Sequence, residues 1–278
     1  MLMMATLHRE AQAFIGFVER QKNLIKRYWL WEVVWLIYSL VSVLSIGYLA
    51  AGLGSLDSTG GFDLRQAQLY LLVGALLWAY LSIVFIEISF SVMWERWEGT
   101  IEYTFMAPVR RLTHLLGICA FALLYGLVRT VVVFLIAMML FHLDLSHANV
   151  VTAAIVLVVS TFPLVGLGIL ASVLPLLSPE RGEQMTVAIQ GVLLVASGVY
   201  YPVSVLPGPL QALARVNPLT YTLDGMRATL IGGRGLPEVA SDLAPLLLMG
   251  MVLVPLGMAV FGWAERRAKR LGLLKRSG

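Results

Sequence analysis

Six long blocks of apolar residues constrain the fold of this chain more than any other feature of its sequence. The blocks cover residues 33–53, 69–88, 115–141, 150–177, 187–206 and 243–263. A helix needs about 20 mostly apolar residues to cross the hydrocarbon core of a membrane, and every block reaches that length. Charged residues make up 13% of the sequence, against about 25% in soluble domains. The pattern predicts an all-α integral membrane protein with six transmembrane helices in a single domain, residues 1–278.

Lys and Arg residues are distributed unevenly between the two sides of the predicted membrane. Fifteen of the 20 precede the first block, follow the last, or lie in the connections after the second and fourth blocks, whereas four lie in the other connections. Because positively charged loops stay in the cytoplasm, both termini are predicted to be cytoplasmic, in a multi-pass protein of the inner (plasma) membrane. The first block starts after about thirty residues without a cleavage site, so we expect no removable signal peptide. A basic tail, residues 264–278, follows the six-span bundle, residues 33–263.

Residues 1–30 have the pattern of an amphipathic helix. Apolar residues recur at helical spacing, and most charged residues lie elsewhere around the helix. The apolar positions are Leu7, Ala11, Phe14, Phe17 and Val18. Such a helix is expected to lie along the inner membrane surface, either as a simple anchor or with a further role.

The connection between the second and third blocks, residues 91–114, carries an apolar stripe and a charged face. The stripe comprises Trp94, Trp97, Ile101, Phe105 and Met106, and the charged face comprises Glu95, Arg96, Glu98 and Glu102. Pro108 then breaks the helix, and Arg110 and Arg111 mark the membrane border. We expect one short amphipathic helix on the cytoplasmic side, which either fits a groove on another protein or lies on lipid.

The connection before the last block, residues 207–242, is long and external in this topology. Residues 210–216 and 219–231 are predicted to form two short helices, because Asn217-Pro218 forces a turn between them and Gly232 and Gly233 end the second. Short apolar helices at this position are expected to dip back into the outer leaflet as re-entrant segments.

Motifs for catalysis are absent from the sequence. A G-x-x-x-x-G-K-[ST] motif is excluded because none of the four lysines follows a glycine, and neither H-E-x-x-H nor G-x-S-x-G occurs. The single cysteine, Cys119, excludes an internal disulfide and a multi-cysteine metal site. The four histidines, which are His8, His114, His142 and His147, are expected to be solvated. The spacing of His142, Asp144 and His147 is a weak metal-binding signal without further ligands. We therefore expect no enzyme activity, metal or cofactor in this chain.

Arg129 is the one clearly intramembrane charge in the third block. It lies fourteen residues beyond Leu115, which corresponds to about 21 Å along a helix. A charge at that depth is costly, so Arg129 is expected to line a transport pathway, to form a structural ion pair, or to reach the outer interface. Glu87 lies near the cytoplasmic end of the second block, at a different predicted depth, and is not expected to pair with Arg129.

Two motifs resemble those of a known family. Residues 95–111, E-R-W-E-G-T-I-E-Y-T-F-M-A-P-V-R-R, resemble the E-R-x-x-G-T-x-x-x-L-x-x-x-P segment of ABC-2 family permeases, the membrane subunits of type-two ATP-binding-cassette exporters. Residues 217–233 are similar to that family's N-P-x-x-[YW]-x-x-[DE]-x-x-R…G-G signature before the last span. The resemblance covers essentially the whole chain and looks closest to the drug- and lipid-exporting branch. Phe105 stands where many relatives have leucine, which preserves an apolar contact.

The resemblance implies a role for each motif. Residues 94–103 would be a coupling helix in a groove of the nucleotide-binding subunit, with the N-terminal helix as a second contact. The candidate coupling residues are Trp94, Glu95, Arg96, Trp97, Glu98, Gly99 and Thr100. Residues 210–231 would be paired re-entrant helices that close the outer end of the pathway. The motif residues there are Asn217, Pro218, Tyr221, Asp224, Arg227, Gly232 and Gly233.

The resemblance also implies an assembly. Two permease subunits, identical or different, would work with two ATPase subunits that bind ATP and Mg. The complex would export a hydrophobic or amphipathic substrate, such as a drug, a lipid or a lipid-linked molecule. The residues alone leave two alternatives open, which are a secondary transporter or channel that works without ATP and a membrane-embedded enzyme.

Overall fold

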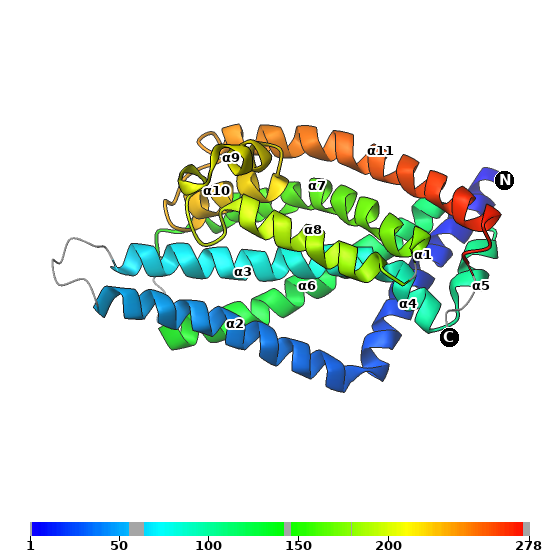
Figure 1. Cartoon of the computed structure of the whole chain (residues 1–278), viewed down its shortest axis with the longest axis horizontal. Helices are drawn as coiled ribbons and strands as arrows, with labels where there is room; N and C mark the ends of the chain where they lie inside the picture. The colour runs from blue at the N-terminus through cyan, green and yellow to red at the C-terminus, as the bar shows by residue number, and fades with distance from the viewer. Residues whose placement is uncertain (1, 56–63, 142–145, 179, 275–278) are drawn as a thin grey trace.

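A computed structural model describes residues 2–55, 64–141, 146–178 and 180–274. Within these ranges the chain is helical and contains no strand (Figure 1). The prediction of an all-α fold is therefore confirmed.

Five of the described helices are long and apolar enough to cross a membrane. They are α2 (Trp29–Ser55), α3 (Leu64–Ser89), α6 (Arg111–Phe141), α7 (Val150–Leu177) and α11 (Ala240–Arg270). Each of them contains one of the predicted apolar blocks, and α7 has the predicted bounds. The other four extend beyond their blocks because polar and charged residues continue the helix past the apolar part.

The fifth predicted block has different bounds from those expected. The helix α8 (Gly182–Ser197) starts five residues earlier and ends nine residues earlier than the block at 187–206. It ends there because Gly198 adopts a left-handed backbone conformation with φ of 73°, which favours glycine. A short 3₁₀ helix, η1 (Val203–Val205), follows. At 1.5 Å per residue α8 is about 24 Å long, which is less than the roughly 30 Å of a membrane core.

The helices α3, α7, α8 and α11 run side by side along the long axis of the molecule (Figure 1). Glycines allow α7 and α11 to approach closely. A Cβ atom added to Gly166 of α7 would lie 2.6 Å from the carbonyl carbon of Leu253, and one added to Gly257 of α11 would lie 2.9 Å from the Gly166 oxygen. The backbones are therefore in direct contact, as small residues permit between membrane helices.

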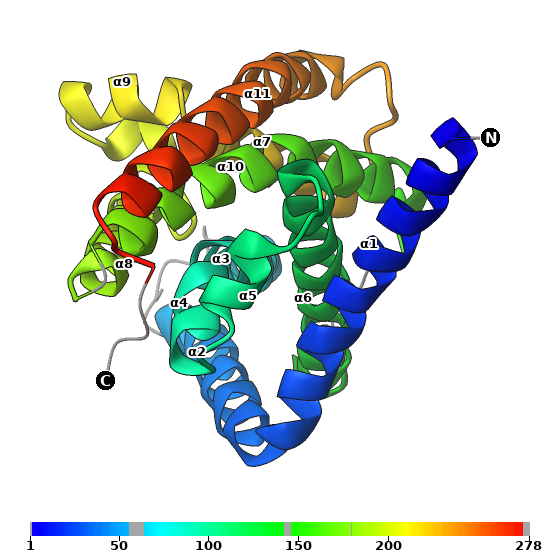
Figure 2. The same cartoon turned by 90° about the vertical axis from the view of Figure 1, so that its right-hand side faces the viewer.

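The two ends of the bundle carry different short helices. Both chain termini lie at one end, together with α1 (Leu2–Arg27), α4 (Ser91–Trp97) and α5 (Ile101–Met106), as Figures 1 and 2 show. The opposite end carries α9 (Gly208–Arg215) and α10 (Pro218–Leu230) (Figure 1). The two short helices predicted in the last connection are thus present, with starts and ends shifted by one or two residues.

The N-terminal helix packs against the bundle. It contacts α6, where the ring centroids of Phe17 and His114 are 4.6 Å apart. A Cβ atom added to Gly117 of α6 would lie 2.8 Å from the Phe17 Cβ, so glycine is needed for this approach. Glu10 accepts a hydrogen bond from the Thr113 hydroxyl, which lowers the pKa of that carboxyl group. The helix is therefore docked on α6 by specific contacts.

The prediction of one amphipathic helix in residues 91–114 is wrong. The segment forms two helices, α4 and α5, which are separated at residues 98–100. The physical reason is Gly99, whose φ of 70° is incompatible with a continuing right-handed helix. The amide of Thr100 donates to the Glu95 carbonyl, which closes the end of α4.

The contact between α7 and α11 generates a testable prediction. We expect Gly166→Leu to lower the stability of the protein by about 1–3 kcal/mol, because the new side chain would overlap the α11 backbone. Thermal unfolding in detergent, followed by size-exclusion chromatography, measures the change. Gly191→Leu on α8 is the control, since no atom lies within 4 Å of a Cβ at that position. Equal midpoints for the two variants would contradict the predicted contact.

Candidate functional site

The Glu95 carboxylate organises the end of the bundle that carries both termini. Its side chain is fully buried, and its Oε1 atom accepts a hydrogen bond from Arg20 of α1 at 3.2 Å. His114 Nε2 of α6 lies 2.9 Å from the same oxygen, and because a carboxylate only accepts, Nε2 donates. Arg20 also donates to the Thr100 hydroxyl at 2.7 Å. One buried carboxylate therefore joins α1, α4 and α6.

The next two charged residues of the motif anchor α4 to other helices. Arg96 is 3% exposed and donates to the carbonyl of Leu176, in the last turn of α7, at 3.0 Å. Burial lowers the pKa of this guanidinium group, and the negative end of the α7 dipole favours its charge. Glu98 accepts hydrogen bonds from Arg27 at 3.0 Å and from the Tyr28 hydroxyl at 2.8 Å. The E-R-x-x-G-T residues thus hold α4 in place from several sides.

The predicted separation of this segment into an apolar stripe and a charged face is wrong. Ile101 and Phe105 are buried in the core with Glu95 and Arg96, whereas Trp97 is 59% exposed. The turn at Gly99 rotates α5 relative to α4, so residues that share a face of one ideal helix do not share one here. The exposed residues of α4 and α5 are Trp97, Glu102, Tyr103 and Met106, which we call the coupling face after the role that the family resemblance implies for this segment. Tyr103 and Met106 are 79% and 83% exposed.

A second guanidinium, the partly buried one of Arg111, fixes α5, and sequence reasoning missed it. Arg111 donates to the backbone oxygens of Thr104 and Phe105 at 2.9 and 2.6 Å, and its Nε donates to Glu265 of α11 at 2.9 Å. Its guanidinium also lies over the Phe105 ring at 4.6 Å from the centroid. The sequence indicated Arg111 only as a membrane-border residue, because nothing local points to a partner 154 residues away.

At the opposite end, α10 begins with a side-chain helix cap. The Asn217 side-chain oxygen accepts from the amide of Leu219, and Pro218 occupies the first position of α10, where its missing N–H costs nothing. The Tyr221 hydroxyl donates back to the carbonyl of Arg215 in α9 at 2.9 Å. The N-P-x-x-Y residues therefore set the angle between α9 and α10.

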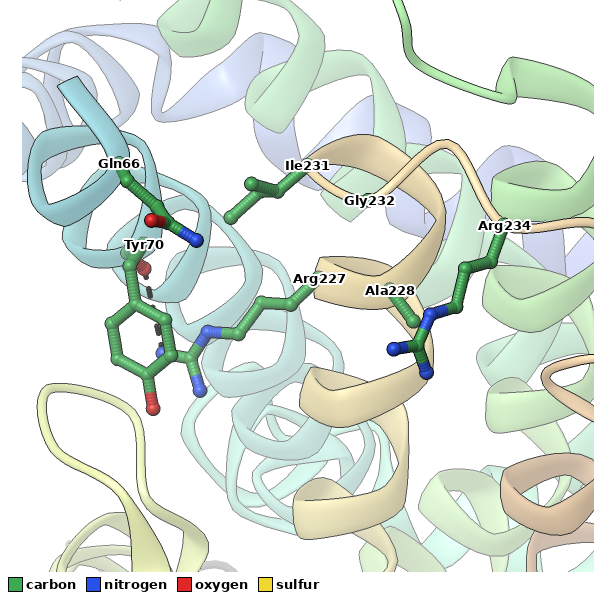
Figure 3. Close-up of a pocket in the computed structure, with 7 residues that line it drawn as sticks. All are labelled: Gln66, Tyr70, Arg227, Ala228, Ile231, Gly232 and Arg234. Carbon is green, nitrogen blue, oxygen red and sulfur yellow. Dashed lines mark hydrogen bonds between the residues drawn. The ribbon is translucent and has the colours of Figure 1, made fainter. Parts of the chain in front are cut away.

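Arg227 of α10 is buried at the same end and stabilises an irregular stretch of backbone. It donates to the carbonyls of Gly198 and Val199 at 3.0 and 2.5 Å, directly after α8. Its guanidinium lies 3.5 Å from the centroid of the Tyr70 ring of α3 (Figure 3). Burial lowers the pKa of the Arg227 guanidinium. Gly74 makes this packing possible, since a Cβ there would lie 2.2 Å from the Val199 oxygen.

The remaining residues of the motif at 217–233 have distinct positions. Gly233 adopts a φ of 64°, and a Cβ there would lie 2.5 Å from the carbonyl oxygen of His147. The amide of Gly232 donates to the Arg227 carbonyl at 3.3 Å, which helps to end α10. Asp224 is exposed and interacts electrostatically with Arg227, without an ion pair between them. The structure thus brings Arg227, Gly232 and Gly233 together and leaves Asp224 outside their hydrogen bonds.

Arg129 joins α6 to α2. It donates to the Ser39 hydroxyl at 2.7 Å, to the backbone oxygen of Trp35, and to the Tyr125 hydroxyl at 3.2 Å. These bonds favour a structural role over a pathway-lining role. The described part of the chain contains no ion pair between Arg129 and Glu87, although the two groups interact electrostatically.

The prediction of solvated histidines is wrong for His114, which is 1% exposed because Glu95 and Phe17 enclose it. His8 and His147 are exposed, as expected. His142 and Asp144 of the weak metal-binding signal lie outside the described residues. The described ranges hold no group of three potential metal ligands.

The arrangement defines a multi-pass membrane protein in which polar contacts hold α4 and α5 at one end of the bundle. Residues 12–231 match the family model of the ABC-2 type transporter. This match covers most of the chain, so the protein belongs to the ABC-2 type transporter family, and its membrane domain is a permease domain. Permease domains of this family in general pair with an ATPase subunit. A comparison with curated proteins gave no match.

The buried carboxylate generates the prediction of this section. We expect Glu95→Gln to reduce stability by about 2–3 kcal/mol, because the amide does not compensate the positive charge of Arg20. Thermal unfolding of the detergent-purified chain measures the loss. Glu102→Gln removes an exposed carboxylate from the same element and is expected to leave the midpoint unchanged. An unchanged midpoint for Glu95→Gln would show that its ion pairs do not hold α1, α4 and α6 together.

Proposed function

We propose that this chain is the permease subunit of an ATP-binding-cassette exporter. It moves a hydrophobic or amphipathic substrate, such as a drug, a lipid or a lipid-linked molecule, out across the inner (plasma) membrane. The energy comes from hydrolysis of ATP, bound with Mg, in a separate ATPase subunit. A second permease subunit, identical or different, completes the pathway. Membership of the ABC-2 type transporter family supports the permease role.

The observation that carries this proposal is the coupling face on a firmly anchored element. Trp, Tyr and Met are enriched in the centres of protein interfaces, and Trp97, Tyr103 and Met106 are exposed together on α4 and α5. Behind them, buried charges join the element to α1, α6, α7 and α11. An apolar, aromatic surface with such rigid support is suited to fit a groove on the ATPase subunit.

This anchoring changes the roles proposed for the motif residues. Glu95, Arg96, Glu98 and Thr100 position the element, Gly99 forms its turn, and Trp97 contacts the ATPase with the rest of the coupling face. Trp94 is half-buried beside it and packs on Trp97 at a centroid distance of 5.4 Å. When ATP draws the two ATPase subunits together, the element moves as a lever and shifts the equilibrium between pathway states.

The proposal includes a topology. The end with α1, α4, α5 and both termini is cytoplasmic, since it carries most of the Lys and Arg residues. The helix α8 and the segment after it form the remaining crossing, which returns the chain from the end of α7 to the outer side. The helices α9 and α10 re-enter the outer leaflet and close the pathway there. The N-terminal helix lies at the inner interface and provides a second contact for the ATPase.

The coupling face leads to a direct test. We expect Met106→Glu to weaken association with the ATPase at least tenfold, because a charge would be buried in an apolar contact. Co-purification in mild detergent and substrate-stimulated ATPase activity measure the effect. Leu236→Glu, in the loop between α10 and α11, is the control for adding a charge at an exposed apolar position. Normal stimulation in Met106→Glu would argue against this docking surface. Transport by the purified chain in vesicles without an ATPase would favour an ATP-independent carrier or channel.

We propose that the residues of the 217–233 motif affect export and not the binding of the ATPase subunit. We expect Arg227→Gln and Asp224→Asn to impair export while the ATPase stays bound, because both positions are at the opposite end from the coupling face. Transport into inverted vesicles and co-purification provide the two readouts. Arg215→Gln on α9 is the matched control, since its exposed side chain forms no hydrogen bond or ion pair among the described residues. Loss of ATPase binding in Arg227→Gln would contradict this division of roles.

A further inference from the structure

A cavity of about 300 Å³ lies beside the last turn of α10, at the end of the bundle opposite the termini. It is lined by Gln66, Tyr70, Arg227, Ala228, Ile231, Gly232 and Arg234 (Figure 3). Its volume is at the lower limit for small-molecule sites, so it suits a headgroup or a small anion better than a whole lipid.

The lining residues are arranged around α10. Tyr70 and Arg227 face each other on one side, and the side chain of Arg234 extends back alongside Ala228 on the other (Figure 3). The end of α10 lies between them and contributes the small residues Ala228 and Gly232 and the apolar Ile231 to the lining. The carbonyl of Ala228 accepts from the Arg234 amide, and that of Arg227 accepts from Ile231, so these oxygens are already paired.

The charges that a ligand would meet are positive. No carboxylate lines the cavity, and neither Arg227 nor Arg234 forms an ion pair within the described ranges. Asp224 and Asp242 interact with these arginines electrostatically from outside the lining. Arg227 is 7% exposed, and its Nε atom is buried without a hydrogen-bond partner. Gln66 lies in the first turn of α3, where the positive end of the helix dipole also favours an anion.

We propose that this cavity binds an anionic group, a phosphate or carboxylate, at the outer membrane surface. Arg234 supplies the accessible charge, Arg227 supplies a fixed charge held by Tyr70 and the carbonyls after α8, and Ile231 provides an apolar edge. The anion is either the headgroup of an outer-leaflet phospholipid or a free anion such as phosphate. Because α10 also holds the backbone after α8, occupancy of the cavity would stabilise the closed arrangement of the outer end.

Binding to the full-length chain tests this proposal without an ATPase, so its result is independent of the coupling mechanism. The chain is reconstituted in nanodiscs, and spin-labelled phosphatidylglycerol is compared with spin-labelled phosphatidylcholine. We expect a preference for phosphatidylglycerol that falls about tenfold in Arg234→Gln, since a charge-assisted hydrogen bond is lost. Ile231→Trp fills the cavity and should also abolish the preference. Arg215→Gln removes the same charge from the neighbouring helix α9 and should leave it unchanged.

The outcomes separate the two sources of the anion. A preference that depends on Arg234 and Ile231 but resists millimolar inorganic phosphate identifies a lipid headgroup. Binding of inorganic phosphate with the same dependence, without a lipid preference, identifies a free anion and also supports the site. An equal loss in Arg215→Gln and Arg234→Gln, or no dependence on any of the three substitutions, would overturn the proposal.

Discussion

The structure depends most on the contacts of one buried carboxylate, Glu95, which forms an ion pair with Arg20 and a hydrogen bond with His114. A buried charge is costly unless it is paired, and here Arg20 and His114 approach the same carboxylate oxygen from two other helices. The pairing therefore brings α1 and α6 against α4. Ile101 and Phe105 are buried beside Glu95, whereas Trp97, Tyr103 and Met106 stay exposed.

At the opposite end of the bundle, the buried charged group is positive. The guanidinium of Arg227 is buried, and backbone carbonyls after α8 satisfy it instead of a carboxylate. Helix α3 connects the two ends, since Tyr70 and Gly74 contact the Arg227 region while its last residue leads into α4.

Sequence patterns predicted the long helices well, because a block of about 20 apolar residues allows few other structures. They predicted α9 and α10 for a similar reason, since Asn217-Pro218 is a strong local signal. They failed at residues 91–114, where helical periodicity alone suggested one helix. The left-handed Gly99 separates the two helices, and the burial of Glu95 depends on partners in other helices, namely Arg20 and His114.

The amino-acid sequence alone determined that the chain is a helical membrane protein, which end is most basic, and where most spans lie, because hydropathy and charge act locally along the chain. Only the tertiary structure decided which charged residues are buried. Glu95, Arg96 and Arg227 are indistinguishable from surface residues in the sequence, and each is buried with a partner on another part of the chain. The physical reason is that the cost of burying a charge is offset only when a distant helix supplies its partner.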